Sequence, residues 1–504
     1  MAAGPGTEDR HLLPRWRKVS HAVEVGEFQT ATARVTSPTD LDMLKRLQRA
    51  WRDEGTEIAA AEFAGAAIIV GDPEFAVDAL AVLQQSSNGP RRALSTDPDD
   101  LSPSMPPDLS KIARLESFWW PGVADARLRT VRDPRNPIAW ADLARHYMIL
   151  GELDRAHRAL GVARALAPRS RYLLRAQVRL LVHSGNPRGA LKALEASPRT
   201  REDPWLMAAS LSVSAGAGLR IVGFKAANRI ITAGNFSRRE LSELHSELAT
   251  IELNDSDRRA RASFRRSLLA PTGNSLAQAE WARTRLSDLE VPLDDPAVPF
   301  KDEAASLAAS ERGEWRSALG HASQWLFDQP FDPRAAIQLS YIAAAGLDDY
   351  QQSLRAALFG LKSSPDNVTL RNNAAYALLE LGDIRTAQAH LDVIATPATH
   401  ERVAVNATRG LLAYRKGDLA QGEALYRQAI KIAQRTGDTG AEAIALGMLM
   451  RERIDAGEID TRLRQDISAL VGLLEKTNDE PAAQRLLKRI VPAAQAALGR
   501  VHPT

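Results

Sequence analysis

The stretch from Asn136 to Pro168 reads NPIAWADLARHYMILGELDRAHRALGVARALAP, and it decides the fold of this 504-residue chain. Its apolar residues recur every three or four positions on both sides of Gly151, which is the spacing of two amphipathic helices. Glycine has no Cβ and accepts the positive φ of a tight turn, so Gly151 lets the two helices fold back on each other. Pro168 cannot continue a helix and should end the second one. The residues expected to pack in this hairpin are Trp140, Leu143, Ala144, Tyr147, Ala156, Leu160 and Ala163.

The same pattern recurs along the chain, which identifies the hairpin as a repeat. A second glycine, Gly185, stands 34 residues after Gly151 and is followed by the same small and apolar residue types. These features resemble the tetratricopeptide repeat. The resemblance implies an all-α chain whose helical hairpins stack as an α-solenoid and form a right-handed superhelix. Later turn glycines of the same pattern are Gly313, Gly346, Gly382 and Gly417.

The pattern also divides the chain into segments. Residues 203–239 have a helical pattern that is out of register with the repeat, so we expect a distorted hairpin there. Proline-rich stretches without apolar periodicity predict loops and breaks. The expected segments are an N-terminal helical hairpin region (1–85), a flexible loop rich in Pro, Ser and Asp (86–110), a central basic repeat block (111–288), a proline-rich break (289–300), a C-terminal repeat block (301–457) and C-terminal capping helices (458–504).

The composition excludes several classes of function. The chain has no cysteine, which rules out disulfides, thiolate catalysis and iron–sulfur clusters. It contains no phosphate-binding P-loop, HExxH or GxSxG motif, so we expect no catalysis, no cofactor and no metal. The first residues lack the apolar core of a secretory signal, and no apolar stretch is long enough to span a bilayer. We therefore expect a cytoplasmic protein without membrane contact, and its 54 arginines against 11 lysines are typical of a GC-rich bacterial genome.

Positive charge is concentrated in the middle of the chain. The net charge is −6 in residues 1–126, +13 in residues 127–266 and −4 in residues 267–504. The resemblance implies that the first helix of each hairpin lines a concave groove. Arginine binds carboxylates and phosphates bidentately, so this groove predicts an acidic protein or peptide partner, unless the arginines pair with nearby acids or only solvate the surface. The residues expected to line it are Arg145, Tyr172, Arg175, Arg179 and His183.

A second groove is expected in the C-terminal repeat block. In peptide-binding tetratricopeptide repeats an asparagine on the inner helix binds the ligand backbone, and the resemblance places Asn373 at that position. The basic partners of the family's carboxylate clamp are missing, which puts capture of a C-terminal carboxylate in doubt. The neighbouring Asn372 has an equal claim to a local structural role. The residues expected to line this groove are Asn373, Tyr376, Tyr414 and Arg415.

These features predict a non-catalytic scaffold or adaptor that binds an extended or acidic partner segment in the groove. One alternative is a nucleic-acid-binding helical-repeat protein, because residues 127–266 carry a net charge of +13; the arginines of residues 258–266 resemble a nucleic-acid stripe but also fit a solvated helix face. A regulatory subunit of an enzyme is the other alternative.

Overall fold

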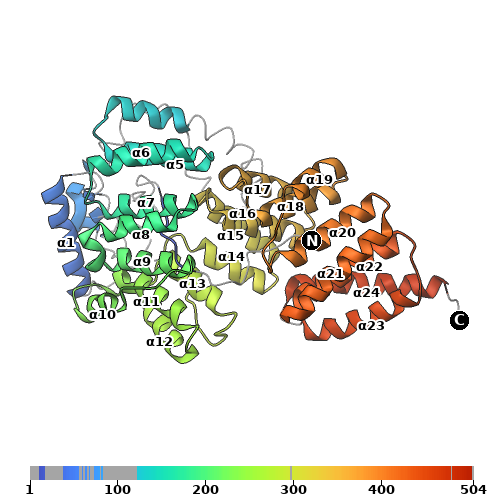
Figure 1. The fold of residues 1–504 in the computed structure, drawn as a ribbon. Helices are drawn as coiled ribbons and strands as arrows, with labels where there is room; N and C mark the ends of the chain where they lie inside the picture. The colour runs from blue at the N-terminus through green and yellow to red at the C-terminus, as the bar shows by residue number, and fades with distance from the viewer. Residues whose placement is uncertain are drawn as a thin grey trace. The chain divides into compact units, whose positions relative to one another are not determined.

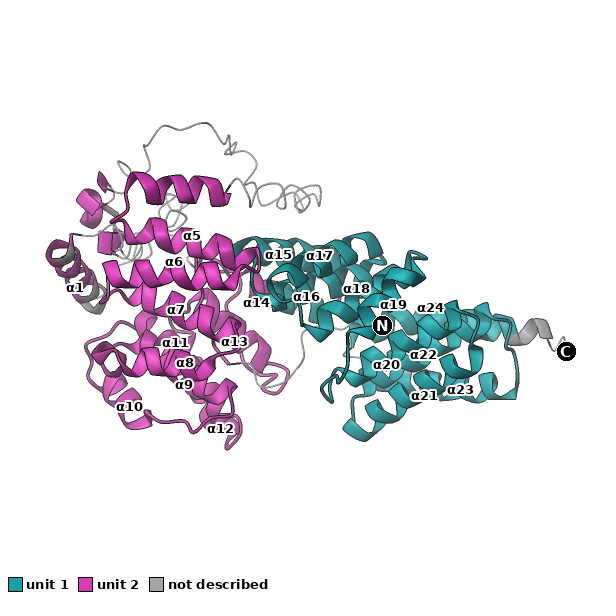
Figure 2. Cartoon of the chain, turned by 45° about the horizontal axis from the view of Figure 1, so that its top comes forward, with its two compact units in different colours: residues 1–6, 106–113, 306–504 teal, residues 7–105, 114–305 magenta. Residues whose placement is uncertain are grey.

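The computed structural model describes residues 11–17, 38–55, 59–60, 63–64, 67, 73–79, 81–82, 122–295, 298–477 and 480–501. Within these ranges every regular element is a helix (Figure 1), so the predicted all-α fold class is confirmed. The chain divides into two compact units, with a boundary between Ala305 and Ser306 (Figure 2). We call the described residues before this boundary the N-terminal unit and those after it the C-terminal unit. The loop expected at 86–110 lies outside the described residues.

The N-terminal unit is a series of helical hairpins. It begins with α1 (Pro38–Glu54), the short 3-10 helix η3 (Pro73–Ala76) and the helical residues 122–132. The helices that follow are α5 (Pro137–Ile149), α6 (Leu153–Leu166), α7 (Arg171–His183), α8 (Pro187–Glu195), the 3-10 helix η5 (Pro198–Arg201), α9 (Pro204–Gly216), α10 (Phe224–Thr232), α11 (Arg238–Glu252), α12 (Asp257–Ser267) and α13 (Gly273–Ala282).

The C-terminal unit continues the same architecture. Helix α14 (Asp302–Glu311) contains the boundary between the units. The later helices are α15 (Trp315–Asp328), α16 (Pro333–Tyr341), the π-helical turn η6 (Ile342–Gly346), α17 (Tyr350–Ser363), α18 (Val368–Glu380), α19 (Ile384–Asp392), α20 (Arg402–Arg415), α21 (Leu419–Thr436), α22 (Thr439–Asp455), α23 (Thr461–Lys476) and α24 (Pro481–Val501).

The hairpin predicted at Asn136–Pro168 is present as α5 and α6, which pack against each other. The side chain of Asn136 caps α5 by accepting hydrogen bonds from two backbone amides of the first turn. Gly151 has a φ of 76°, which a residue with a Cβ rarely adopts. Small residues such as Ala156 are fully buried where the two helices meet. The cap, the turn glycine and the small residues that the sequence shows are thus all used in this hairpin.

One expected turn glycine has a different role. Gly346 ends the π-helical turn η6, and the positive φ of the turn is at Asp348 instead. A Cβ on Gly346 would lie 2.4 Å from the indole ring of Trp315. This glycine is therefore required by close packing rather than by the turn, which corrects the expectation.

The region 203–239 forms an irregular hairpin, as predicted. Its first helix, α9, has 13 residues, whereas α10 has only 9. A loop of residues 217–223 separates them and ends at Gly223, whose φ is 111°. This connection is longer than residues 150–152, which join α5 and α6.

The first helices of successive hairpins lie next to one another within each unit. In the N-terminal unit α5 packs on α7, α7 on α9, α9 on α11, and α11 on α13. In the C-terminal unit α16, α18, α20 and α22 form the corresponding series. This arrangement is the stacking of a tetratricopeptide-like α-solenoid.

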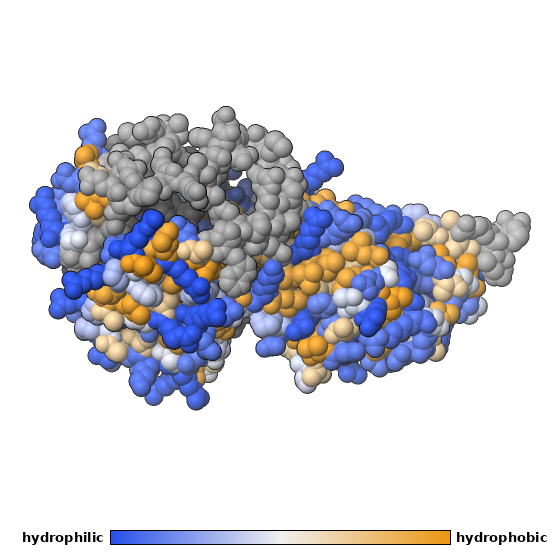
Figure 3. Space-filling view, turned by 90° about the horizontal axis from the view of Figure 1, so that it is seen from above, coloured by the Kyte–Doolittle hydropathy of each residue, from blue (hydrophilic) through white to orange (hydrophobic). Residues whose placement is uncertain are grey.

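The surface of the C-terminal unit carries a hydrophobic area. Figure 3 shows hydrophobic residues gathered on one face of this unit, and its exposed large side chains include Leu358, Leu381 and Val393. None of the helices that the structure describes combines the length and hydrophobicity of a membrane-spanning segment.

Candidate peptide-binding site

Residues 11–17, HLLPRWR, lie against the first helices of the N-terminal unit. They form neither helix nor strand, and burial alternates along them, with Leu12, Pro14 and Trp16 buried and the others partly exposed. This period of two is that of an extended chain. Five successive first helices each supply a polar side chain to the segment, and we call the surface that these side chains define the inner face: Arg145 of α5, Tyr172 of α7, Ser212 of α9, Glu247 of α11 and Asn274 of α13.

The inner face binds the backbone of the first half of the segment. The amide of Leu12 donates to Glu247 Oε2 at 3.1 Å, and the hydroxyl of Ser212 donates to the carbonyl of Leu12. Asn274 Nδ2 donates to the carbonyl of Leu13 at 3.1 Å. These contacts would be available to any peptide, because they use groups that every residue except proline carries in full.

Trp16 anchors the second half of the segment. Its side chain is 0% exposed, and its Nε1 donates to the Tyr172 hydroxyl at 3.2 Å. The same hydroxyl donates to the carbonyl of Arg17 at 2.7 Å, while Arg145 Nε donates to the carbonyl of Trp16 at 3.2 Å. Burial raises the pKa of Tyr172, and the negative charge of Asp142 raises it further, so the hydroxyl stays protonated and remains a donor.

Arg15 lies in a cradle between the start of α13 and the start of α14. Its guanidinium donates to Glu303 Oε2 at 2.6 Å, to the carbonyl of Phe300 at 2.9 Å and to the carbonyl of Gly273 at 3.1 Å. Phe300 has a φ of 59°, a strained value for a residue with a side chain. Its ring receives the guanidinium of Arg17, whose central carbon is 3.7 Å from the ring centroid.

A buried carboxyl group on the inner face, that of Glu247, receives the start of the segment. His11 Nδ1 is 2.8 Å from Glu247 Oε1, and the Glu247 side chain is 0% exposed. Burial raises the pKa of Glu247, and the hydrogen bonds from His11 and Leu12 partly offset this rise. A buried carboxylate is tolerated only with such partners, so the face favours donors and cations at this point.

Two of the expected groove residues, Arg145 and Tyr172, therefore contact a peptide segment, whereas the other three do not share an open basic surface with them. Arg175 pairs with Glu243 at 2.8 Å and stacks on the Trp205 ring at 4.9 Å. Arg179 is 4% exposed, and His183 is partly buried at the end of α7. The sequence has few acidic residues near Arg175, and this did not reveal that Glu243, which lies on α11, pairs with it.

In the C-terminal unit the expected residues on α18 lie in a packed polar layer. Asn373 is 0% exposed and its Nδ2 donates to the Ser340 hydroxyl at 2.9 Å. The side chain of Asn372 donates to Asn373 at 3.4 Å. Tyr376 is 6% exposed, and its ring meets that of Tyr350 edge-on at 6.0 Å. These contacts show both asparagines engaged within the unit.

The expected residues on α20 face carboxylates. The hydroxyl of Tyr414 donates to Glu458 at 3.4 Å, and burial raises the pKa of this tyrosine. Arg415 forms an ion pair with Glu452 and lies 3.9 Å from Glu380. A ligand for this second groove stays a prediction.

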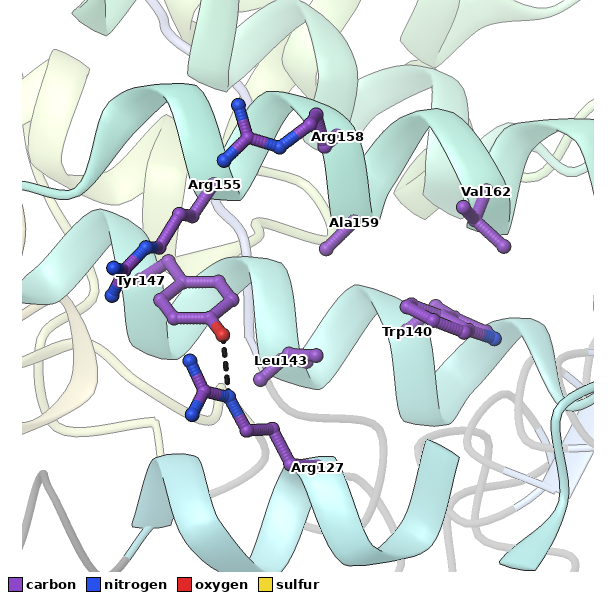
Figure 4. A pocket seen from close by; sticks show the side chains of 8 residues that line it. All are labelled: Arg127, Trp140, Leu143, Tyr147, Arg155, Arg158, Ala159 and Val162. Carbon is purple, nitrogen blue, oxygen red and sulfur yellow. Dashed lines mark hydrogen bonds between the residues drawn. The ribbon is translucent and has the colours of Figure 1, made fainter. Parts of the chain in front are cut away.

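A shallow pocket of about 350 Å³ lies beside α5 and α6 (Figure 4). Arg127 Nε donates to the Tyr147 hydroxyl at 2.7 Å, and the Arg155 guanidinium lies 5.9 Å from the centre of the same ring. Trp140, expected to be in the hairpin core, is only partly buried and lines this pocket instead. The other lining residues are Leu143, Arg158, Ala159 and Val162.

Three of the five arginines of α12 pair with acids. Arg259 pairs with Asp255 at 3.4 Å, and Arg261 and Arg265 lie 3.0 Å and 3.7 Å from Asp288. These pairs reduce the charge available to a phosphate backbone. The described residues also contain no cluster of His, Asp and Glu side chains that could ligate a metal ion.

Sequence reasoning missed the segment itself, three of the five inner-face contacts and the cradle of Arg15. Residues 11–17 have no helical periodicity, and they meet partners more than 100 positions away in the chain. Ser212, Glu247 and Asn274 belong to the less regular repeats, where the inner positions could not be assigned. The only local signal was a tryptophan and two leucines among basic residues.

Similarity to known proteins is confined to solved structures. No protein-family model matches the chain, and no curated protein matches it in sequence. It resembles yeast Tom70 at 13% identity, over 77% of this chain and 94% of that one, with a TM-score of 0.28. It resembles the APC/C heterotetramer Cut9–Hcn1 at 13% sequence identity, over 77% of this chain and 94% of that one, with a TM-score of 0.30. It resembles the human IFIT1 dimer with PPP-AAAA at 13% sequence identity, over 90% of this chain and 95% of that one, with a TM-score of 0.33. Likeness at this level does not bear on function, so the class rests on the molecule's own geometry: a helical-repeat protein with tetratricopeptide-like hairpins.

Proposed function

We propose that this chain is a non-catalytic adaptor that holds an extended segment of a partner protein on the inner face of its N-terminal unit. The observation that carries the proposal is that five successive first helices each direct a polar side chain to one extended segment, residues 11–17. The repeat therefore supplies a row of contacts to a peptide, which is the task of an adaptor groove.

The chemistry of these contacts supports holding rather than reaction. Four of the five side chains donate to backbone carbonyls, and Glu247 accepts from a backbone amide. Backbone contacts supply affinity for many sequences, whereas the pockets between them select side chains. Each polar group named here is engaged in positioning the segment.

The acidic partner predicted from the excess of arginine does not enter this proposal. Arg145 is directed at a peptide carbonyl, and Arg175 is paired with Glu243. The segment that lies on the inner face carries arginines itself, at positions 15 and 17.

The test is a peptide-binding measurement on the full-length chain. The chain would carry Trp16→Ala, which removes the anchor of residues 11–17, and fluorescence anisotropy would report binding of short labelled peptides of varied sequence. We expect a subset to bind, and Ser212→Ala together with Asn274→Ala to weaken them about 30-fold, because two hydrogen bonds are lost. Ser468→Ala, at an exposed serine of α23 in the C-terminal unit, is the control and should leave peptide binding unchanged. The proposal fails if no peptide binds, or if the Ser212 and Asn274 substitutions have no effect.

A further inference from the structure

The inner face contains a closed site for an indole. Trp16 is 0% exposed, and its Nε1 reaches the Tyr172 hydroxyl at 3.2 Å. Tyr172 in turn donates to the next carbonyl of the segment. Tryptophan is the side chain that matches such a site, because it combines a large apolar area with a single hydrogen-bond donor. A smaller residue would leave a cavity and an unused acceptor.

The site beside it is built for a guanidinium. Arg15 is 8% exposed and Glu303 is 1% exposed, so this ion pair is nearly removed from water. Two backbone carbonyls complete the arginine's shell, those of Phe300 and Gly273. A buried carboxylate strongly disfavours a neutral or acidic occupant, because its charge would lose a partner. Arginine fits better than lysine, since its planar fork reaches several acceptors at once.

The backbone around the Arg15 cradle is closely packed at Gly273 and conformationally strained at Phe300. A Cβ on Gly273 would lie 2.3 Å from the Phe300 carbonyl oxygen, so only glycine permits this approach. Phe300 adopts a left-handed φ of 59° and presents its carbonyl to Arg15 and its ring to Arg17. Strain of this kind is concentrated at functional sites in proteins.

We infer that the partner segment is extended and basic, with an arginine directly before a tryptophan, and that residues 11–17 occupy its place until it displaces them. This inference rests on the proposed function and names the chemistry of the partner and the regulation of the site. A segment in the same chain acts at a high effective concentration, on the order of millimolar for a short connection. The wild-type chain should therefore bind such a partner weakly, and loosening residues 11–17 should strengthen binding.

The experiment uses the full-length chain and a labelled synthetic peptide with the sequence of residues 9–19. Binding is measured by fluorescence anisotropy to the wild-type chain and to two release variants, Trp16→Ala and Arg15→Glu. We expect the Trp16→Ala chain to bind the peptide about 100-fold more tightly than wild type, because its own segment has lost a buried tryptophan. Peptides with Trp16→Ala or Arg15→Glu should bind this chain at least about 10-fold more weakly than the natural peptide.

A further variant tests whether Glu303 causes the preference for an arginine in the peptide. Adding Glu303→Gln to the Trp16→Ala chain should abolish most of the discrimination between the natural peptide and the Arg15→Glu peptide. A discrimination that survives this change would overturn the role of the cradle.

The remaining outcomes separate this inference from the proposed function. If other peptides bind the release variants but the Arg–Trp peptide has no advantage, the inference fails and the adaptor function stands. If both release variants fail to fold, or fold and bind no peptide, residues 11–17 are a permanent part of the fold and the inference fails. If light scattering shows that wild type forms dimers that Trp16→Ala dissolves, the occupant is a second copy of this chain, and the inference is overturned.

Discussion

Replacing Tyr172 with phenylalanine removes one oxygen atom from the centre of the inner face. That oxygen accepts a hydrogen bond from Trp16 Nε1 at 3.2 Å and donates one to the carbonyl of Arg17 at 2.7 Å. The ring of phenylalanine fills the same space, so packing is retained and only the two hydrogen bonds are lost. Because the indole of Trp16 is fully buried, its N–H cannot find a water molecule in compensation.

The expected loss can be estimated from these two bonds. Each contributes about 1 kcal/mol net, so the segment should be held about 2 kcal/mol less firmly. This corresponds to a rise of about 30-fold in the population of chains whose segment has left the inner face. Global stability should change less, because the segment can open while the helices stay folded.

Trypsin provides the assay, because cleavage after Arg15 requires that its backbone leave the cradle. The rate at which the fragment ending at Arg15 is released, followed by mass spectrometry, should rise about 30-fold in Tyr172→Phe when opening is fast relative to cleavage. The control is Tyr147→Phe, which removes a hydroxyl bonded to Arg127 at 2.7 Å in the pocket of Figure 4. Equal cleavage rates in Tyr172→Phe and the wild type would refute the reasoning.

Three further predictions concern stability. Burial, and to a smaller extent the charge of Arg266, lowers the pKa of His245 from 6.5 to about 4. As the pH falls, His245 is therefore protonated in the unfolded chain before it is protonated in the native state. Between pH 6.5 and about 4 the free energy of unfolding should fall by up to about 3 kcal/mol. Denaturant titrations at several pH values should show this loss, and His245→Gln should remove it. Gly151→Val should destabilise the fold by about 2–3 kcal/mol in the same assay, because Gly151 has a φ of 76°. Arg453→Met should cost about 1–2 kcal/mol in the same assay, because Arg453 is 2% exposed and its ion pair with the nearly buried Asp466 would be lost, although Arg427 still pairs with that carboxylate.

Two comparisons make these stability tests decisive. Gly161→Val lies on the same hairpin as Gly151, at a position where a Cβ would meet no atom within 4 Å, and it should change stability by less than about 1 kcal/mol. If Gly151→Val is no more harmful than Gly161→Val, the turn does not depend on its positive φ. A pH dependence that is identical in His245→Gln and the wild type would assign the acid sensitivity to other groups.

The parts of the fold that sequence could predict are those determined by neighbours in the chain. The α5–α6 hairpin follows from helical spacing, a capping asparagine and a turn glycine, all within Asn136–Pro168. The pairing of Arg175 with Glu243 depends on residues 68 positions apart, and no local pattern announces it. Gly346 could not be interpreted from the sequence for the same reason. Its spacing is that of a turn glycine, but its lack of a side chain is required by close packing against Trp315, which is 31 positions away in the chain.

The candidate site was predictable only in part for the same reason. The resemblance to tetratricopeptide repeats placed Arg145 and Tyr172 on the inner side of their helices, and both contact residues 11–17 of the same chain there. The position of residues 11–17 on the inner face could not be predicted, because the sequence of an extended segment contains no pattern that indicates which helices it contacts. Its charge also could not be foreseen from regional composition, since the decisive carboxylates, Glu247 and Glu303, come from separate helices.

The missing side chain at Gly273 has a consequence for how the affinity of this site can change. A single methyl group there would push against the Phe300 carbonyl and widen the arginine cradle from behind. The hold on residues 11–17 can thus be adjusted by a side chain that does not itself contact Arg15. Variants that hold this segment more weakly could begin at this glycine and leave every side chain that contacts the segment unchanged.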